Sequence, residues 1–277
     1  MPPPKPHRLG MEGGWAPVRE GPSAHRPGPK GTAMSVLTAR GLRKRYGAET
    51  VLDGVDLQLR PGTTLAVLGA SGSGKSTLLG ILAGLEAADA GQVWVDGRDV
   101  TREPPERRQV VYLYQEALLF PHLTAYENVA FGLRVAKLPR AEIAARTRAM
   151  LERLALGSRA HRMPNQLSGG QRQRVAFGRA LVLEPRVLLL DEPFGALDPG
   201  TRDSMQRFFR EVVAAQGTST VFVTHDLKEA LRIGDDFARL SDGKLSFHPD
   251  RQSFLRDPRV GALEELRFWQ ESFGAKS

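Results

Sequence analysis

Apolar and polar positions alternate along residues 36–59, and this two-residue period predicts half-buried β-strands. Val36 and Thr38 mark the first of these strands, while Val55, Leu57 and Leu59 lie on one face of the next. The folded region is therefore expected to begin with β-structure.

Further short strands are expected next, of which Thr64–Leu68 is a continuous apolar run and Val187–Leu190 is expected to be buried. The expected strands are Thr64–Leu68, Gln92–Val95, Val110–Tyr114, Val187–Leu190 and Thr220–Val223. Segments with helical spacing or helix stop signals separate them. The expected helices are Lys75–Ala83, Arg140–Leu156, Gln171–Leu183, Thr201–Ala215 and one from about Leu227. This alternation predicts an α/β fold with a mostly parallel sheet covered on both faces.

Residues 117–166 contain no convincing strand and indicate a helical insert in the α/β core. The helix expected within the insert stops at Gly157 and has one apolar face, formed by Ile143, Met150, Leu151 and Leu154. The helix from Thr201 should turn five apolar residues inward: Met205, Phe208, Phe209, Val212 and Val213.

The two ends of the chain differ from this pattern. Residues 1–34 hold eight prolines and six glycines, a composition typical of a disordered extension. The alternative is that translation begins at Met34, so that this segment does not exist in the cell. Residues 248–277 are expected to form a short C-terminal tail with a possible helix over Val260–Phe273.

The sequence contains no cysteine, which excludes a disulfide framework, a thiolate metal site, an iron–sulfur cluster and a cysteine nucleophile. No apolar run approaches the ~20 residues of a membrane span, and residues 1–30 lack the apolar core of a secretory signal. We therefore expect a soluble, intracellular protein. The net charge of +8 suits a phosphate, lipid or nucleic-acid partner, although a solvated arginine-rich surface is the simpler explanation.

Residues 69–77 read Gly-Ala-Ser-Gly-Ser-Gly-Lys-Ser-Thr and fit the phosphate-loop pattern G-x-x-x-x-G-K-[ST]. They follow an expected strand and open an expected helix, which is the context that supports this motif. Glycines let successive backbone N–H groups point at one anion, and the helix N-terminus adds partial positive charge. In such a loop Lys75 reaches the β- and γ-phosphates, and Ser76 offers its hydroxyl to Mg²⁺.

Asp191 and Glu192 directly follow the apolar run Val187–Leu190. A buried parallel strand carries the acids at its carboxyl end to the ligand edge of the sheet. Asp191 can then hold the Mg²⁺ shell, and Glu192 can accept a proton from the attacking water as a general base. The alternative is a surface Asp-Glu turn, which the presence of a phosphate loop disfavours.

The segment Leu167-Ser168-Gly169-Gly170-Gln171 immediately precedes an amphipathic helix. Ser168 is a good N-cap, and two glycines with free N–H groups at a helix start form a second candidate anion site. Taken alone, the segment is more simply interpreted as an ordinary capped helix.

In this order the phosphate loop, LSGGQRQR, LLLDEPFGALD and VTHD make residues 35–247 similar to the ATP-binding subunit of ABC transporters. The form DEPFGALD resembles bacterial importers more than exporters. The resemblance implies a P-loop NTPase (RecA-like) core with a mostly parallel sheet, an N-terminal antiparallel β portion and a helical subdomain insert. It implies ATP hydrolysis with ATP and Mg²⁺ as cofactors.

The resemblance also implies roles for single residues, each of which has a structural alternative. Tyr46 matches the aromatic residue that stacks on adenine, but it could be a strand-edge aromatic. Gln115 matches the glutamine that touches Mg²⁺ and senses the permease, but it could be a polar strand end. His225 matches the switch histidine that helps to align Glu192 and the water, although a lone histidine is usually structural.

Ser168 and Gly170 match residues that close over the γ-phosphate of an ATP held by another subunit. Asp198 matches the loop that links the two sites, and it could instead, or in addition, cap the following helix. Two copies would sandwich two ATP molecules head to tail.

Three sets of site residues result. The implied ATP-binding residues are Tyr46, Gly69, Ser71, Gly72, Ser73, Gly74, Lys75, Ser76, Thr77, Ser168, Gly169, Gly170, Gln171 and Asp198. The implied metal-binding residues are Ser76, Gln115 and Asp191. The implied catalytic residues are Glu192, His225 and Gln115.

The partners implied by the resemblance are integral-membrane permease subunits, a second ATPase subunit that is the same chain or a paralogue, and an extracytoplasmic solute-binding protein not contacted directly. These partners imply a peripheral position on the cytoplasmic face of the inner membrane. No nucleic-acid partner is expected. Residues 115–133 include Leu118, Leu119, Phe120 and Phe131, which either pack helices or line a groove for a permease helix. The sequence does not identify the solute.

Two other function classes are considered. ATPases of DNA repair insert long coiled coils, but only 52 positions separate Gln115 from Leu167; ribosomal types carry two cassettes, and LSGGQ occurs once. A regulator without turnover conflicts with the presence of Glu192 and His225.

Among departures from the family pattern, Gly178 replaces a common alanine at an expected cost of ~1 kcal/mol in helix propensity.

Overall fold

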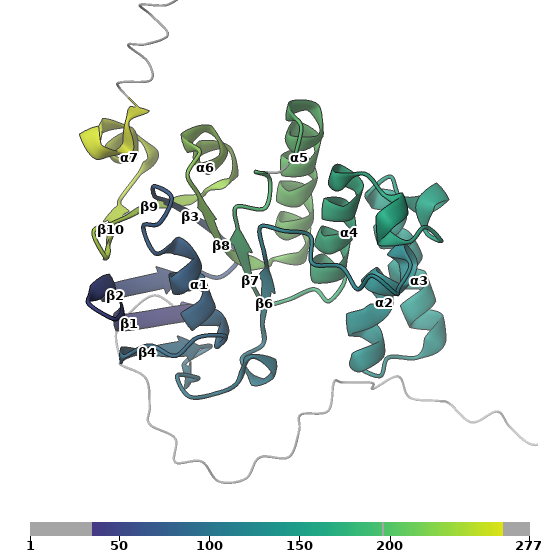
Figure 1. Cartoon of the computed structure of the whole chain (residues 1–277), viewed down its shortest axis with the longest axis horizontal. Coiled ribbons are helices and arrows are strands. Elements are labelled where there is room, and N and C mark those ends of the chain that lie inside the picture. The colour runs from purple at the N-terminus through teal and green to yellow at the C-terminus, as the bar shows by residue number, and fades with distance from the viewer. Residues whose placement is uncertain (1–34, 196, 263–277) are drawn as a thin grey trace, which may run out of the picture.

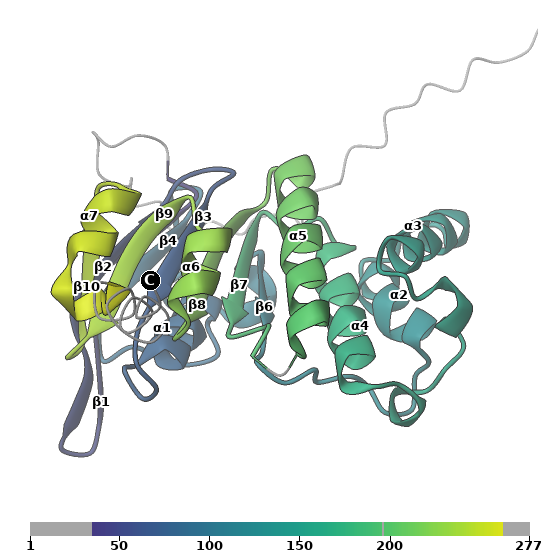
Figure 2. The same cartoon turned by 90° about the horizontal axis from the view of Figure 1, so that it is seen from above.

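The computed structural model describes residues 35–195 and 197–262 (Figure 1). The Pro- and Gly-rich segment 1–34 lies outside the described residues, as does most of the helix expected over Val260–Phe273. Figures 1 and 2 show the described part as two sheets with helices packed around them.

The N-terminal sheet is antiparallel, as expected. Its strands, in sheet order, are β2 (Glu49–Leu59), β1 (Leu37–Tyr46), β4 (Ala90–Val95) and β5 (Arg98–Asp99). A tight turn joins β1 to β2 and places Tyr46 opposite Glu49. Gly47 in this turn has φ of 59°, a conformation that glycine adopts at little cost.

The second sheet has six strands, and all neighbours in it are parallel except β10 and β9. Its strands, in sheet order, are β10 (Lys244–His248), β9 (Asp236–Ser241), β3 (Thr64–Leu68), β8 (Ser219–Thr224), β7 (Val187–Asp191) and β6 (Val110–Leu113). The mostly parallel sheet is thus confirmed. β9 and β10 have no counterpart among the strands expected from the sequence.

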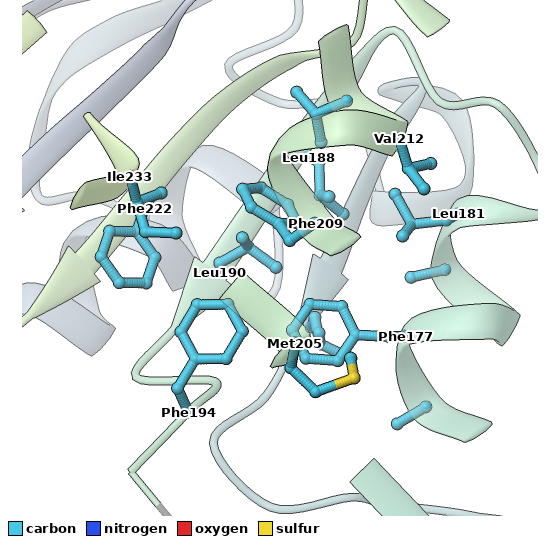
Figure 3. Packing of buried hydrophobic residues seen from close by; sticks show 14 of the residues in the cluster. Phe177, Leu181, Leu188, Leu190, Phe194, Met205, Phe209, Val212, Phe222 and Ile233 are labelled. Carbon is cyan, nitrogen blue, oxygen red and sulfur yellow. The ribbon is translucent and has the colours of Figure 1, made fainter. Parts of the chain in front are cut away.

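The central strands of this sheet are buried on both faces, which confirms a second expectation. In β7, Leu188 and Leu190 pack with Phe222 on one face, while Val187 and Leu189 pack on the other. Figure 3 shows the first face, where side chains of the sheet meet those of the flanking helices. The second face packs against α1 and the antiparallel sheet.

The α-helices are α1 (Lys75–Ala83), α2 (Ala125–Val135), α3 (Arg140–Arg153), α4 (Gly169–Leu181), α5 (Pro199–Gln216), α6 (Leu227–Ile233) and α7 (Arg251–Arg256). Short 3₁₀ turns occur at Pro105–Arg107, Gly157–Arg159, Pro164–Gln166 and Pro258–Val260. Residues 117–166 form no strand and hold α2 and α3, so the helical insert is confirmed. In α5, Phe208 is only half-buried, whereas the other four residues expected inward are buried.

The chain beyond residue 247 is packed against the domain as far as it is described. The ring of Phe254 in α7 is fully buried and stacks on Phe237 of β9, with 5.0 Å between ring centroids. Val260 and Ala262 belong to the same core cluster. Residues 248–262 therefore pack with the rest of the described chain.

The phosphate-loop helix α1 is anchored at its carboxyl end by a buried arginine. The Arg108 guanidinium donates to the carbonyl oxygens of Ile81 and Leu82 at 2.7 and 3.2 Å, and also to those of Thr101 and Glu103. A cation beside the last carbonyls of a helix satisfies orphan acceptors and opposes the negative end of its dipole. The opposite end of α1, which opens the site, is thereby held in place.

The low helix propensity of glycine suggests that Gly178 weakens helix α4, but its surroundings in the structure require a glycine. A Cβ atom at this position would lie 2.7 Å from Leu154 Cδ1, 3.2 Å from Val129 Cγ2 and 3.3 Å from Met150 Cγ. These neighbours are buried side chains of the helical insert. Glycine is required here because α4 approaches the insert closely, and this packing offsets the cost in helix propensity.

We predict that Gly178→Ala lowers the free energy of unfolding by about 1–2 kcal/mol despite alanine's higher propensity, because the methyl group overpacks the core. Urea denaturation measures this change. Gly169→Ala, at the exposed start of the same helix, is the matched control and should shift stability by less than ~0.5 kcal/mol. An increase in stability for Gly178→Ala would contradict the packing explanation.

Candidate functional site

A cleft of about 350 Å³ opens where the loop after β3 meets the ends of β6 and β7. Eight of its nine lining residues belong to the sets expected from the sequence, and Val51 is the exception. The lining residues are Val51, Ser71, Gly72, Gly74, Lys75, Ser76, Thr77, Gln115 and Glu192. The structure thus brings the phosphate loop, Gln115 and Glu192 to one place.

The loop itself depends on glycine at two kinds of position. Gly72 and Gly74 have φ of 78° and 96°, in the left-handed region that other residues adopt at a cost. At Gly69 the limit is space, since a Cβ atom there would lie 2.5 Å from Ser73 Oγ and 2.7 Å from the carbonyl oxygen of Leu240. A loop of this shape can curl its N–H groups around an anion.

Lys75 is held in a fixed position within the loop. Its side chain is 5% exposed, and Nζ donates to the carbonyl oxygens of Gly69 and Ala70, at 2.9 Å each. Nζ also lies 3.2 Å from Glu192 Oε1. The ammonium group therefore faces the cleft with its orientation already set, and it is paired with the acid at the end of β7.

Glu192 follows β7 with φ of 42°, a positive value that is uncommon for a residue with a side chain. Its carboxylate is 13% exposed, and Oε2 lies 2.6 Å from Nδ1 of His225. His225 directly follows β8 and is about half exposed. The segments that follow β3, β7 and β8 thus bring Lys75, Glu192 and His225 together, and Glu192 contacts both other residues.

Asp191 and Gln115 lie at different depths. Asp191 is buried at the end of β7, and its Oδ2 accepts a hydrogen bond of 2.9 Å from the Tyr112 hydroxyl. Burial, reinforced by the Asp191 charge, raises the pKa of Tyr112, so the phenol remains a donor. Gln115 borders the cleft directly, whereas Asp191 is not among the residues that line it.

Tyr46 lies at the rim of the cleft, at the end of β1. Its hydroxyl oxygen is 3.5 Å from Thr77 Oγ1, which is one of the lining residues, and half of its surface is exposed. The exposed ring is therefore available at the rim of the cleft, while its hydroxyl donates to Glu86.

The second expected anion site lies elsewhere on the molecule. Ser168 caps α4 as expected, because its Oγ accepts a hydrogen bond from the Gln171 N–H at 3.3 Å. In turn, the Ser168 N–H donates to Oε1 of Gln171. Asp198 caps α5 through Thr201 N–H, and this hydrogen bond lowers the pKa of Asp198. The capping alternative for Asp198 is therefore confirmed.

The starts of α4 and α5 adjoin each other, but not the cleft. A Cβ atom on Gly170 would lie 3.2 Å from Thr201 Cγ2. In both Figure 1 and Figure 2 these helices and α1 are on opposite sides of β7. Within one chain, the structure therefore separates Ser168–Gln171 and Asp198 from the phosphate loop.

The sequence analysis missed a buried network behind His225. Glu229, which is 5% exposed, accepts hydrogen bonds from Thr224 Oγ1 at 3.0 Å and from the Gln206 amide at 3.3 Å. Arg202 Nε lies 3.8 Å away, and its Nη2 donates to the Leu197 carbonyl next to Asp198. The sequence signal was a glutamate four residues after His225, on the buried face of a short helix.

An apolar groove of about 520 Å³ lies beside Gln115, between β6, α2 and α4. Phe120 and Phe131 form part of its wall with ring centroids 4.5 Å apart, while Leu118 and Val135 are more than half exposed. The apolar content of residues 115–133 is therefore not fully used in helix packing. Among the described residues, no helix has the length and apolarity to cross a membrane.

Comparison with known protein families supports this geometry. Residues 52–195, just over half of the chain, match the family described as ABC transporter. The chain is 52% identical over 208 residues to the sulfate/thiosulfate import ATP-binding protein CysA of Xylella fastidiosa, and 49% identical over 213 residues to that of Caulobacter vibrioides. These matches cover 74% and 76% of this chain but 60% and 63% of the relatives. The chain thus spans about 60% of the length of the curated relatives it matches.

A solved structure also resembles the chain. It is the dimeric post-hydrolysis state of the ATP-binding cassette MJ0796, bound to ADP and Pi. The two share 32% sequence identity and a TM-score of 0.69, and the match covers 76% of this chain and 96% of the other. At this level of identity and overlap, the likeness extends to the whole cassette.

We predict a pH signature for the network behind His225. Burial raises the pKa of Glu229, so the carboxyl group is protonated more readily in the folded state than in the unfolded state. Its contribution to stability is complete below the unfolded pKa of about 4.5 and is lost as pH rises through the folded pKa. Relative to Glu229→Gln, the wild-type free energy of unfolding should therefore decline as the pH rises above about 4.5.

Urea unfolding of both proteins at a series of pH values measures this difference. Glu229→Ala, which leaves the Thr224 hydroxyl and the Gln206 amide without an acceptor, should cost about 1–3 kcal/mol. Parallel pH curves for the wild type and Glu229→Gln would show that burial does not control this carboxyl group.

Proposed function

The chain belongs to the ABC transporter family, and from this premise we propose that it is the ATP-hydrolysing subunit of an importer. It binds ATP with Mg²⁺ and couples hydrolysis to solute transport by a separate membrane permease. The observation that carries this proposal is the connected group of Lys75, Glu192 and His225 at the wall of the cleft.

Each member of this group has a distinct task. Lys75 binds the β- and γ-phosphates by charge, and the phosphate loop surrounds them with N–H groups. Glu192 orients the attacking water and accepts its proton. His225 donates to Glu192 or to the γ-phosphate, which keeps the carboxylate aimed at the water. The 2.6 Å contact between His225 and Glu192 supports this division of roles.

The residues present fit Mg²⁺ bound with a nucleotide. Among the described residues, no group of three or more His, Cys, Asp or Glu side chains could hold a metal ion alone. Mg²⁺ in such sites needs only one or two protein ligands, because phosphate oxygens and waters complete its octahedron. Ser76 and Gln115, which line the cleft, and Asp191, which is buried at the end of β7, would supply these ligands, and the ion would neutralise charge on the phosphates.

We extend the proposal to a dimer with two nucleotides at its interface. The capped starts of α4 and α5 present Ser168, Gly170 and Asp198 on a surface away from the chain's own cleft. In a head-to-tail dimer this surface would meet the partner's cleft and close over the γ-phosphate. The dimeric arrangement of the structurally similar cassette supports this step.

The permease is proposed to dock at the apolar groove around Phe120 and Phe131, peripherally to the cytoplasmic membrane face. Gln115 lies beside this groove and also lines the cleft, so it can connect docking with hydrolysis. The similar curated proteins are named for sulfate and thiosulfate import, and these oxyanions are the first solutes to test. A solute-binding protein would belong to the same system without touching this chain.

We predict that Glu192→Gln slows ATP hydrolysis by about 10²–10⁴-fold, because the general base is lost, while ATP still binds. Lys75→Ala is the contrasting variant and should weaken ATP binding itself. Phosphate release and nucleotide affinity, measured on the same preparations, separate the two effects. Full activity in Glu192→Gln would remove Glu192 from its role, and unchanged affinity in Lys75→Ala would count against the phosphate loop.

We also predict that Phe120→Glu abolishes co-purification of a multi-span membrane protein with the tagged chain and uncouples transport. A charge in the groove opposes docking of an apolar helix face, while the ATP cleft is untouched and basal hydrolysis remains. Phe247→Glu, at an exposed aromatic on β10, is the matched control and should retain the permease. Loss of both hydrolysis and docking in Phe120→Glu would indicate a packing role instead.

A further inference from the structure

The ring of Tyr46 rests on a pair of charged side chains that the proposed reaction does not use. Its hydroxyl donates to the Glu86 carboxylate, and the Lys44 ammonium lies 5.3 Å from the ring centroid. Lys44 and Tyr46 are two residues apart in β1, and Glu86 belongs to the loop after α1. The two charges thus hold both the polar tip and one side of the ring.

Lys44 is itself tightly held. Its side chain is only 14% exposed, and Nζ donates to the Ala87 carbonyl at 2.8 Å while lying 3.1 Å from Glu86 Oε1. Asp89 Oδ1 is 3.9 Å away. The hydrogen bond to Glu86 is the main cause that raises the pKa of Lys44, so the group stays charged. A surface lysine without a task is seldom enclosed by three acceptors in this way.

This arrangement links the ring to the helix that begins at the phosphate loop. The Glu86 N–H donates to the Gly80 carbonyl in α1 at 3.2 Å, and the Tyr46 hydroxyl also approaches Thr77 of α1. The distance between the ring and the phosphate cleft is therefore set through α1 and Glu86, rather than by the hairpin tip alone.

We infer that Lys44 and Glu86 are positioning residues that preorganise Tyr46 as a stacking platform for the nucleobase of the bound nucleotide. This inference rests on the proposed function, in which Tyr46 meets the base. A ring that is already fixed loses no conformational freedom when the base stacks on it, and the cation on one side leaves the other side for the base. Removing either charge frees the ring.

A purely structural ion pair would brace the hairpin without affecting the base, and two ligands separate these roles. ATP uses both the platform and the phosphate loop, whereas inorganic tripolyphosphate uses the loop alone. Removing the charge of Lys44 or of Glu86 frees the Tyr46 ring and should weaken ATP binding by about two- to tenfold. It should leave the affinity for tripolyphosphate unchanged, which also verifies that each variant is folded.

The test measures dissociation constants of the full chain for ATP and for tripolyphosphate, both with Mg²⁺, by calorimetry. Glu86→Leu and Lys44→Met should each weaken ATP binding alone, with KM raised and kcat nearly constant. Glu86→Gln, which keeps an acceptor for the Tyr46 hydroxyl, should show a smaller loss. Adding Tyr46→Phe to Glu86→Leu should cause no further loss. Asp96→Asn, which breaks the surface pair with Arg186, is the matched control and should change neither affinity.

Unchanged ATP affinity in both Glu86→Leu and Lys44→Met would overturn the inference, as would an equal loss for ATP and tripolyphosphate. Unchanged ATP affinity in Tyr46→Ala would also overturn it, because the ring would then not meet the base. A wild-type chain that binds neither ligand would instead overturn the proposed function, and with it this inference.

Discussion

The geometry of the site depends on the register of three parallel strands, β3, β8 and β7. Their hydrogen-bond ladder continues beyond the strands, where Gly69 N–H donates to the Thr224 carbonyl and Glu192 N–H to that of Val223. Because these strands are buried on both faces, a shift of one residue would turn every side chain to the wrong face. The core thus fixes where Lys75 and His225 meet Glu192.

The sequence was most informative where local pattern and tertiary environment agree. The bounds of β3 and α1 are those expected, because an apolar run, a glycine loop and a helix start follow one another without ambiguity. The position of Gln115 beside the phosphate loop was expected from family resemblance, not from local pattern. By contrast, β9 and α7 depend on the contact between Phe237 and Phe254, which only the folded chain creates.

Two residues show why local rules fail at specific places. Gly178 reads as a helix weakness, yet its missing side chain is what lets α4 approach Leu154 and Val129. Glu229 carries no expectation from the sequence, yet it is enclosed and hydrogen-bonded to Thr224, directly before His225. In both cases burial decides the role of the residue, and burial is a property of the assembled core that spacing along the chain does not reveal.

The separation of the two anion sites has an energetic consequence for the proposed dimer. In that dimer, the phosphate loop would hold the β-phosphate of either ATP or ADP, whereas the partner's Ser168 and Gly170 would contact the γ-phosphate, which only ATP carries. A ligand shifts an equilibrium only by its differential affinity for the two states. Dimer closure would then depend on contacts with a single phosphoryl group. Hydrolysis of the γ-phosphate, with Glu192 as general base, would remove the contacts that favour the closed state.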